Sequence, residues 1–451
     1  MDESRDTRNN FFAISIILFI SIVALLYSIQ NLMSPGLETM SVYFGFGGDT
    51  IQLGVLTFTF TIIGGITMIF FGYLSDKLTR VRILFSGSIL FSIASTLTLF
   101  VTPDYNGYLL FFVLQIFVGF GFGALIPATF SLMGDMIKEG DRAKGFSFFS
   151  IATLIGTAVG QLLGAIFVDI DWRFSYFYLG IAGIVASCLV LTLKEPNRIG
   201  RDFLYLAEGE DVEYTYRIKK EDLKVIFKKK TNIWLIINFV DTIPTGIILF
   251  LLYKYLFQVH NIPEAMGIIF LAFVLISTLV GTVIFGAVGD ALFKKGKKKA
   301  RVYLALIANV APIPFVFIGL NIPFSLPNNA DIGTLFVIPE AVLMLILVSA
   351  GLFINGATNG SWYATVVDIN LPEHRATTLA TANFFDIIGR AVGPLIGAIL
   401  TDTYGIMIGI NASIIFWILI PFFWIGVLKN VVPDMDETRE IFKQRLEDLE
   451  K

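Results

Sequence analysis

The sequence predicts an all-α membrane protein whose twelve transmembrane helices form two pseudo-symmetric six-helix bundles. Three observations predict this class: the composition, the spacing of apolar stretches and an internal repeat. The chain has 451 residues, of which 55% are hydrophobic and 15% charged, and its mean hydropathy is +0.77. These values are more apolar than those of ordinary soluble domains. The 40 glycines and 44 phenylalanines suit helices that pack closely in lipid.

Twelve apolar stretches are each long enough, at about 20 residues, for a helix to cross about 30 Å of hydrocarbon. They cover about 11–33, 51–72, 83–101, 108–134, 145–168 and 174–193, and then about 232–258, 265–289, 302–322, 334–366, 378–400 and 406–428. We therefore expect an N-terminal bundle over 1–193, a cytoplasmic linker over 194–231, a C-terminal bundle over 232–428 and a tail helix over 429–451.

The basic residues orient these spans. All but three of the 33 Lys and Arg residues fall on one side of the predicted membrane, and the exceptions are Arg173, Lys254 and Arg390. Loops that are rich in Lys and Arg stay on the cytoplasmic side. The sequence thus predicts a multi-pass protein of the cytoplasmic membrane with both termini in the cytoplasm.

The internal repeat joins the fifth and eleventh spans. Residues 156–167 read GTAVGQLLGAIF and residues 389–400 read GRAVGPLIGAIL, with eight of twelve positions identical. Glycines at every fourth position share one helix face, which lets another helix approach closely. We expect this packing role, with sliding surfaces between the two halves as the alternative, for Gly156, Gly160, Gly164, Gly389, Gly393 and Gly397. GFGFG at 119–123 lies inside a span, so we interpret it as a packing point rather than a phosphate loop.

Two loops share a second repeated pattern, in which Gly is followed by Asp four residues later and by a basic residue four residues after that. The stretch GYLSDKLTR follows the second span and GAVGDALFK follows the eighth. These loops, with the layout of six plus six spans, resemble the major facilitator superfamily. The resemblance implies a latch that holds the cytoplasmic side in one state, and the alternative is charge that only sets topology. The latch candidates are Gly72, Asp76, Arg80, Gly286, Asp290, Arg142 and Arg375. Asp368, Glu373 and His374 lie next to Arg375 and favour a gate network.

Within that superfamily, FGYLSDKLTRVRIL, VGFGFGALIPATFSLMGDM and LPEHRATTLATANFFDIIGRAVGP resemble the spinster-like branch and its prokaryotic relatives. The resemblance implies a lysophospholipid or another lipid-like substrate. The chain departs from that branch in its first half. It has Gln30 and Asn31 where the branch usually has an Asp-Arg pair, and Gln115 and Phe122 where it usually has an Arg and a Glu.

Ionisable residues deep in spans are costly to bury and are therefore functional candidates. They occur only in the second half, as Asp241 in the seventh span and as Asp386 and Arg390 in the eleventh. Asp386 and Arg390 are spaced i, i+4 and can form an ion pair. Both carboxylates lie about 13 Å from the cytoplasmic helix ends, at the depth of transporter sites. We expect these three residues to couple protons or charge to transport, with a structural salt bridge as the alternative.

Polar residues on the spans that line the central cavity in this superfamily are the substrate candidates. Their amides can bind hydroxyls and phosphate-ester oxygens without requiring a charge. They are Gln30, Asn31, Gln115, Asn355, Asn359 and Trp362.

The sequence therefore favours a secondary active transporter that moves an amphipathic or lipid-like solute, with lysophospholipid favoured and protons as the candidate coupling ion. The alternative is a transporter of drugs or small polar metabolites, and remoter alternatives are a non-transporting sensor or a membrane enzyme. Both histidines lie in loops and no span holds a catalytic or metal-ligand set. We expect a monomer among membrane lipids, with no catalytic residue, metal, cofactor or nucleic-acid partner.

Overall fold

The computed structural model describes residues 2–136, 142–193, 221–328 and 330–449, and over these ranges the chain is helical with no strand. It divides into two compact units, Met1–Asp211 (unit 1) and Val212–Lys451 (unit 2). In the described part, ten helices are long and apolar enough to cross a membrane. Two shorter apolar helices, Ile17–Asn31 and Ala152–Phe167, coincide with the remaining predicted spans. The predicted all-α membrane fold is confirmed.

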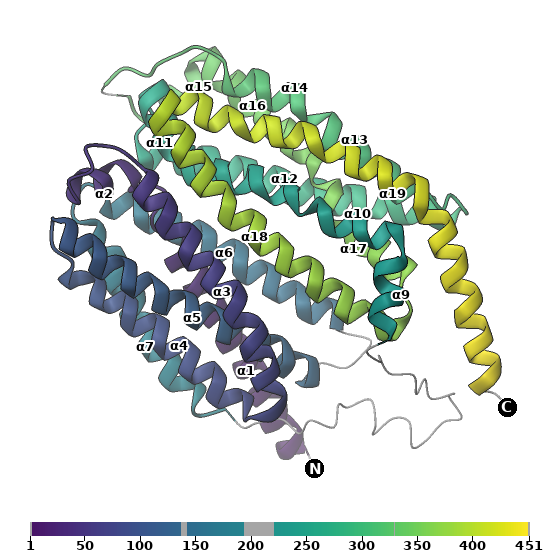
Figure 1. The fold of residues 1–451 in the computed structure, drawn as a ribbon. Coiled ribbons are helices and arrows are strands. Elements are labelled where there is room, and N and C mark those ends of the chain that lie inside the picture. Colours follow the sequence, from purple (N-terminus) through teal and green to yellow (C-terminus); the bar gives the residue numbers. More distant parts are fainter. Residues whose placement is uncertain (1, 137–141, 194–220, 329, 450–451) are drawn as a thin grey trace. The chain divides into compact units, whose positions relative to one another are not determined.

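Unit 1 contains the first six predicted spans (Figure 1). Helix α5 packs against α3 and α4, α4 also packs against α7, and α1 packs against α6. The elements are α1 (Asp2–Asn31), α2 (Leu37–Tyr43), α3 (Ile51–Lys77), α4 (Arg80–Leu97), η1 (Thr98–Phe100), α5 (Tyr105–Met136), α6 (Arg142–Phe167) and α7 (Trp172–Val190).

The GFGFG motif in α5 allows two helices to approach its backbone. A Cβ atom on Gly119 would lie 2.7 Å from the Phe60 carbonyl oxygen of α3, and one on Gly121 would lie 2.7 Å from the Gly87 carbonyl oxygen of α4. Only a residue without a side chain fits such contacts. The alternating glycines therefore let α5 pack between α3 and α4.

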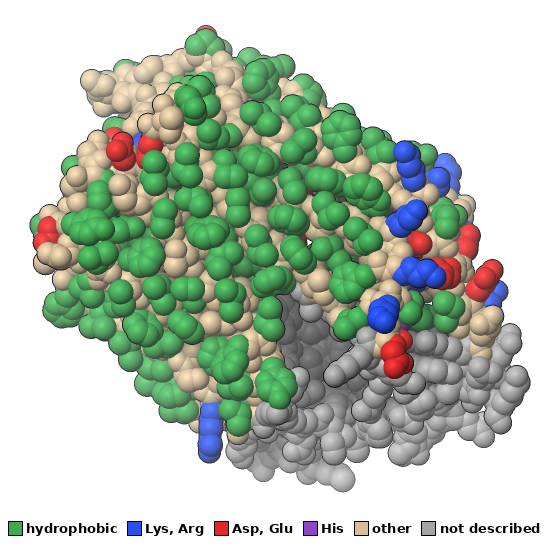
Figure 2. Space-filling view, viewed as in Figure 1, with side chains coloured by type: hydrophobic (Ala, Val, Ile, Leu, Met, Phe, Trp, Pro, Cys, Tyr) green, Lys and Arg blue, Asp and Glu red, His purple; other side chains and the backbone are tan. Residues whose placement is uncertain are grey.

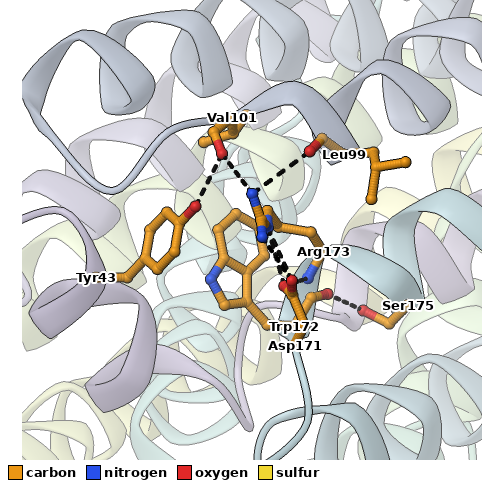
Figure 3. A network of polar contacts seen from close by, with 7 residues as sticks. All are labelled: Tyr43, Leu99, Val101, Asp171, Trp172, Arg173 and Ser175. Carbon is orange, nitrogen blue, oxygen red and sulfur yellow. Dashed lines mark hydrogen bonds and ion pairs between the residues drawn. The ribbon is translucent and has the colours of Figure 1, made fainter.

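Arg173, one of the three exceptions to the charge rule, joins three segments at one end of unit 1 (Figure 3). Asp171 caps α7 and pairs with the Arg173 guanidinium at 2.6 Å. The guanidinium Nη1 donates to the Val101 carbonyl at 2.8 Å and reaches the Leu99 carbonyl at 3.5 Å. The Tyr43 hydroxyl donates to the same Val101 carbonyl at 2.8 Å. Local polar groups therefore satisfy this cation, and its contacts are those of a structural clamp.

Unit 2 contains the other six predicted spans, but three of them are divided (Figure 1). The seventh span consists of α10, η3 and α11, the ninth of α13 and α14, and the tenth of α16 and α17. The elements are α9 (Asp222–Lys228), α10 (Lys230–Ile237), η3 (Asn238–Asp241), α11 (Thr242–His260), α12 (Glu264–Lys294), α13 (Ala300–Val310), α14 (Pro312–Leu320), α15 (Ile332–Val337), α16 (Pro339–Asn355), α17 (Ala357–Ile369), α18 (Pro372–Tyr404) and α19 (Ile406–Leu449).

The last predicted span and the predicted tail form one helix. Helix α19 continues through the expected boundary at residue 428, with Pro421 and Pro433 inside it. Its distal part is held to unit 2, because the Asp434 carboxylate accepts the backbone N–H of Thr231 at 3.0 Å and the Thr438 hydroxyl donates to the Ile369 carbonyl at 2.7 Å. The tail is thus an extension of the bundle rather than a separate element.

The outer surfaces are apolar, as lipid requires. Hydrophobic side chains cover most of the visible face in Figure 2, and the basic side chains seen on unit 2 gather at one end, near the distal part of α19. Helix α12 is the clearest case, since only 17% of its most apolar window is buried and Ile276 and Val283 are exposed. Such a helix suits a lipid-facing position.

Both copies of the glycine repeat pack against the first long helix of their own unit. In unit 1, a Cβ on Gly160 would lie 2.1 Å from the Ser28 carbonyl oxygen of α1. In unit 2, a Cβ on Gly393 would lie 2.6 Å from the Ile243 carbonyl oxygen of α11. The flanking glycines of unit 1 also lie close to backbone carbonyls, since a Cβ on Gly156 would meet Ala24 of α1 and one on Gly164 would meet Leu32 just after it. In unit 2, a Cβ on Gly389 would meet Thr242 and Phe239, and one on Gly397 would lie 3.1 Å from a leucine side chain of α11.

Candidate functional site

The seventh span is interrupted at its polar residues. Helix α10 ends at Ile237, the 3-10 turn η3 covers Asn238–Asp241, and α11 begins at Thr242. Asn, Asp and Thr side chains compete for backbone hydrogen bonds, and Pro244 has no N–H to donate in the first turn of α11. A 3-10 segment inside a longer helix often marks a functional hinge. The stretch NFVDTIP therefore favours the change from α-helix to 3-10 helix, although the apolar residues around it predict one uniform helix.

The break holds a compact set of polar contacts. The Asn238 side-chain Nδ2 donates to the Asp241 carboxylate at 2.8 Å. The Thr242 hydroxyl donates to the Phe239 carbonyl at 2.7 Å and lies 3.1 Å from the Asp386 carbonyl of α18. The last contact joins the first residue of α11 to α18, where the second copy of the repeat packs.

The structure brings together the three ionisable residues that the sequence singles out. Asp386 and Arg390 lie one turn apart on α18, and both are within electrostatic range of Asp241. The Asp241 and Asp386 side chains are partly buried, whereas Arg390 is exposed. No described carboxylate lies within 4.0 Å of the Arg390 guanidinium, so the ion pair that the i, i+4 spacing allows is not formed among the described residues. Two carboxylates therefore lie within electrostatic range of one cation that no described carboxylate contacts directly.

Two aromatic residues of α17 complete the surroundings. Tyr363 is exposed and lies within electrostatic range of Asp241, Asp386 and Arg390. The buried Trp362 donates its indole N–H to the Leu235 carbonyl at 3.1 Å, just before η3. Trp362 therefore supports the interrupted helix. The sequence interpretation missed Tyr363, although it neighbours a candidate in the same span.

The other substrate candidates are distributed over both units. In unit 1, the Asn31 amide donates to the Tyr27 carbonyl at 2.8 Å and lies 3.5 Å from the Thr157 hydroxyl, while Gln30 and Gln115 each bury one amide atom that has no hydrogen-bond partner among the described residues. In unit 2, the Asn355 amide donates to the Ala308 carbonyl at 3.2 Å. The Asn359 side chain lies outside the described residues.

One latch candidate of unit 2, Asp290, is joined through Arg301 to Asp368, which was predicted for the gate network. Arg301 at the start of α13 donates to the Asp290 carboxylate at 2.6 Å through Nη2 and pairs with Asp368 of α17 through Nη1. The Arg301 guanidinium also lies 4.2 Å from the Phe293 ring centroid. Gly286 lies on α12 with open space where a Cβ would be. The bridging arginine comes from the next span and was not among the candidates.

In unit 1, Gly72 lies inside α3 and Arg80 begins α4 with a buried side chain. The side chains of Asp76, Arg142 and Arg375 lie outside the described residues.

A second polar cluster lies at the end of unit 2 that carries α9. The Lys229 ammonium donates to the Ile369 carbonyl at 2.7 Å and to the Thr438 hydroxyl. Asn232 and Asn370 exchange two hydrogen bonds of 2.8 Å. Burial lowers the pKa of Lys229 from its ordinary value, although nearby acidic groups of α19 oppose the change. The cluster joins Lys229, which lies between α9 and α10, and Asn232 of α10 to the end of α17 and the loop that follows it.

His374 extends this cluster toward α9. Its Nε2 lies 3.7 Å from the Asp222 carboxylate, and its side chain is buried. Burial lowers the pKa of His374 below its ordinary value of 6.5, while Asp222 acts to raise it. The described residues include no group of three or more His, Cys, Asp or Glu side chains that could hold a metal ion.

Comparisons with known proteins agree with this architecture. The family model described as Major Facilitator Superfamily matches residues 16–339. The sphingosine-1-phosphate transporter SPNS2 of Danio rerio is 23% identical over 355 residues, which are 74% of this chain and 65% of that protein. The quinolone resistance protein NorA of Staphylococcus aureus is 25% identical over 148 residues, which are 33% of this chain and 37% of that protein. The chain therefore spans less than two thirds of the length of either relative.

A solved structure shows the same fold over nearly the whole chain. It is the crystal structure of a bacterial homologue of the human lysosomal transporter spinster, in an inward-facing and unoccupied conformation. The TM-score is 0.76 at 15% sequence identity, and the match covers 94% of this chain and 98% of that one. At this identity the likeness concerns the fold.

Proposed function

The chain belongs to the major facilitator superfamily, whose members are transporters rather than enzymes, and on that basis we propose a specific transport function for it. It is a secondary active transporter that moves an amphipathic, lipid-like solute, with lysophospholipid favoured, across the cytoplasmic membrane by alternating access. It works as a monomer. Both termini lie in the cytoplasm, in keeping with the distribution of Lys and Arg.

The observation that carries the proposal is the charge cluster at the break in the seventh span. Asp241, Asp386 and Arg390 bear two negative charges and one positive charge, and no described carboxylate pairs directly with Arg390. A partly buried, uncompensated carboxylate in a membrane protein costs several kcal/mol, so one carboxylate binds a proton when its exposure changes. Proton uptake on one side and release on the other would couple transport to a pH gradient.

Two observations support a lipid-like solute. The polar candidates of unit 1, Gln30, Asn31 and Gln115, are amides, which bind phosphate-ester and hydroxyl oxygens without adding a fixed charge. One relative has a name that describes the transport of sphingosine-1-phosphate, which is itself an amphipathic lipid phosphate. The Arg301 bridge between Asp290 and Asp368 would act as the latch that opens when the solute has been bound.

Flux of a labelled lysophospholipid into proteoliposomes, with and without an imposed pH gradient, tests the proposal. We expect gradient-stimulated flux for the natural chain and loss of the stimulation in Asp241→Asn and Asp386→Asn. Asp49→Asn is the matched control, because it removes an exposed carboxylate outside the spans. Stimulation that persists in both site variants would show that these carboxylates do not couple protons.

The similarity to NorA favours one alternative, a transporter of drugs or of small polar metabolites with the same fold. The same proteoliposomes distinguish the two, because a quinolone drug would then be carried in place of the lysophospholipid. Flux of the drug without flux of the lipid would favour the alternative.

A further inference from the structure

We propose that the η3 turn and the first residue of α11 form a binding site for a monovalent cation, Na⁺, through the side-chain oxygens of Asn238, Asp241 and Thr242, with Asp386 nearby on α18. The role of this ion in transport rests on the proposed function, whereas its binding is a property of unit 2 that can be measured without any transported solute.

A buried acceptor without a partner points to a missing ligand. The Asn238 side chain is only 3% exposed, and its Oδ1 has no hydrogen-bond partner among the described residues. The amide orientation follows for the ionised form of Asp241, because that carboxylate can only accept and Nδ2 then faces it. A buried amide oxygen left unpaired destabilises a protein, and a cation at this position removes that cost.

The three side chains that supply ligand oxygens lie on one side of the turn. Asn238, Asp241 and Thr242 are spaced i, i+3 and i+4, which places their side chains on one helical face. The Thr242 hydroxyl uses its proton toward the Phe239 and Asp386 carbonyls, so its oxygen lone pairs remain for a cation. An amide, a carboxylate and a hydroxyl oxygen are hard ligands that suit a cation of this type.

The 3-10 turn lies inside the continuous helical span Lys230–His260 and changes its backbone hydrogen-bonding pattern at Asn238–Asp241. Such a change within a longer helix often marks a functional position. The Trp362 indole donates to the Leu235 carbonyl at 3.1 Å and so supports the turn of α10 that precedes Asn238.

The local charge favours one positive charge rather than two. The charged groups in range are Asp241, Asp386 and Arg390, which sum to one negative charge when both carboxylates are ionised. Tyr363 is the other titratable group that faces them. A monovalent ion brings this cluster to neutrality, whereas a divalent ion would leave it positive. A proton on Asp241 would compete with Na⁺ for the same oxygens.

Direct binding of ²²Na⁺ to the purified full-length protein in detergent tests the site, with choline chloride to keep the ionic strength constant. At alkaline pH we expect saturable binding and a rise in apparent melting temperature with Na⁺ but not with choline. Loss of one ligand should weaken binding about tenfold or more in Asn238→Ala, and Asp241→Asn should abolish it. Acidification should weaken binding through competition.

Thr242→Val provides a second ligand variant of nearly unchanged volume, and we expect weaker binding there also. Asn321→Ala is the matched control, because it removes an exposed amide that bonds Asn411 at the far side of unit 2, and it should bind Na⁺ normally. Absence of saturable binding in the folded natural chain, or natural affinity in both Asn238→Ala and Thr242→Val, would overturn the site. Binding of Na⁺ without lysophospholipid flux would leave the site standing and reject the substrate, whereas pH-driven flux without Na⁺ binding would do the reverse.

Discussion

Helices α1 and α6 of unit 1 and helices α11 and α18 of unit 2 are two versions of one packing arrangement. A Cβ on Gly156 would meet the Ala24 carbonyl at 2.4 Å, and one on its repeat partner Gly389 would meet the Phe239 carbonyl at 2.6 Å. The next glycines continue the same register along both helix pairs. The backbone contact is therefore common to the two units.

The side chains around that contact differ. In the register set by the glycines, Asn238 and Asp241 correspond to Val23 and Leu26, which are buried apolar residues of the uninterrupted helix α1. Arg390 corresponds to Thr157, whose hydroxyl lies 3.5 Å from the Asn31 amide. Close packing and ion chemistry are thus independent properties, and only the second copy carries the ionisable groups.

A carboxylate placed in the first copy should give the largest effect. We expect Leu26→Asp to lower stability by about 3 kcal/mol, because unit 1 offers this buried position neither a break nor a basic partner within its span. The reverse change, Asp241→Leu, should remove coupling at a smaller cost, about 1–2 kcal/mol, because it removes a buried charge but also leaves the Asn238 amide without its acceptor. Equal destabilisation by both changes would mean that the charge of Asp241 is structural.

The glycine contacts should give the next effect, in both units. Gly160→Ala and Gly393→Ala each place a methyl group against a backbone carbonyl and should cost about 1–3 kcal/mol. Gly286→Ala is the control, since open space surrounds that position and alanine favours the helix. Thermal denaturation monitored by size-exclusion chromatography measures the three variants. A neutral Gly160→Ala would indicate that α1 and α6 can separate without cost.

The latch of unit 2 should give a smaller change. Arg301→Lys retains the charge but cannot reach both Asp290 and Asp368, and we expect a loss of about 1 kcal/mol with altered transport rates. Arg80→Lys applies the same change to unit 1, where the arginine is buried at the start of α4. If both variants shift the melting temperature and the flux by similar amounts, both units have a latch of similar strength. If only Arg301→Lys has an effect, the latch is confined to unit 2.

The smallest effect should be a pH dependence confined to unit 2, which holds both histidines. Burial depresses the pKa of His374 in the folded chain, so the unfolded chain binds the proton first as the pH falls below 6.5. Stability is therefore complete above 6.5 and declines as the pH falls toward the lower folded value. His374→Gln should reduce the slope of the melting temperature over this window, and adding His260→Gln should reduce it further, because His260 is also buried. An unchanged slope in His374→Gln would assign the dependence to other groups.

Much of the fold could be predicted from the sequence because membrane insertion is governed by local properties. Apolar length predicted the spans, and the spacing of glycines predicted a packing face, since each depends on residues close together in the chain. The depth of Asp241 and Asp386 followed from the same counting. The breaks in three spans and the continuity of α19 through residue 428 did not, because a 3-10 turn depends on which backbone groups find partners on neighbouring helices.

The sequence by itself determined the class, the twelve apolar segments, the duplicated halves and the placement of ionisable residues in the second half only. The tertiary structure alone decided the partners of those residues. It joined Asn238 to Asp241, left Arg390 apart from described carboxylates, and gave Asp290 an arginine from the next span. The physical reason is that a hydrogen bond or ion pair depends on distances of a few ångströms between side-chain atoms, and spacing along one helix allows such a contact without deciding whether it forms.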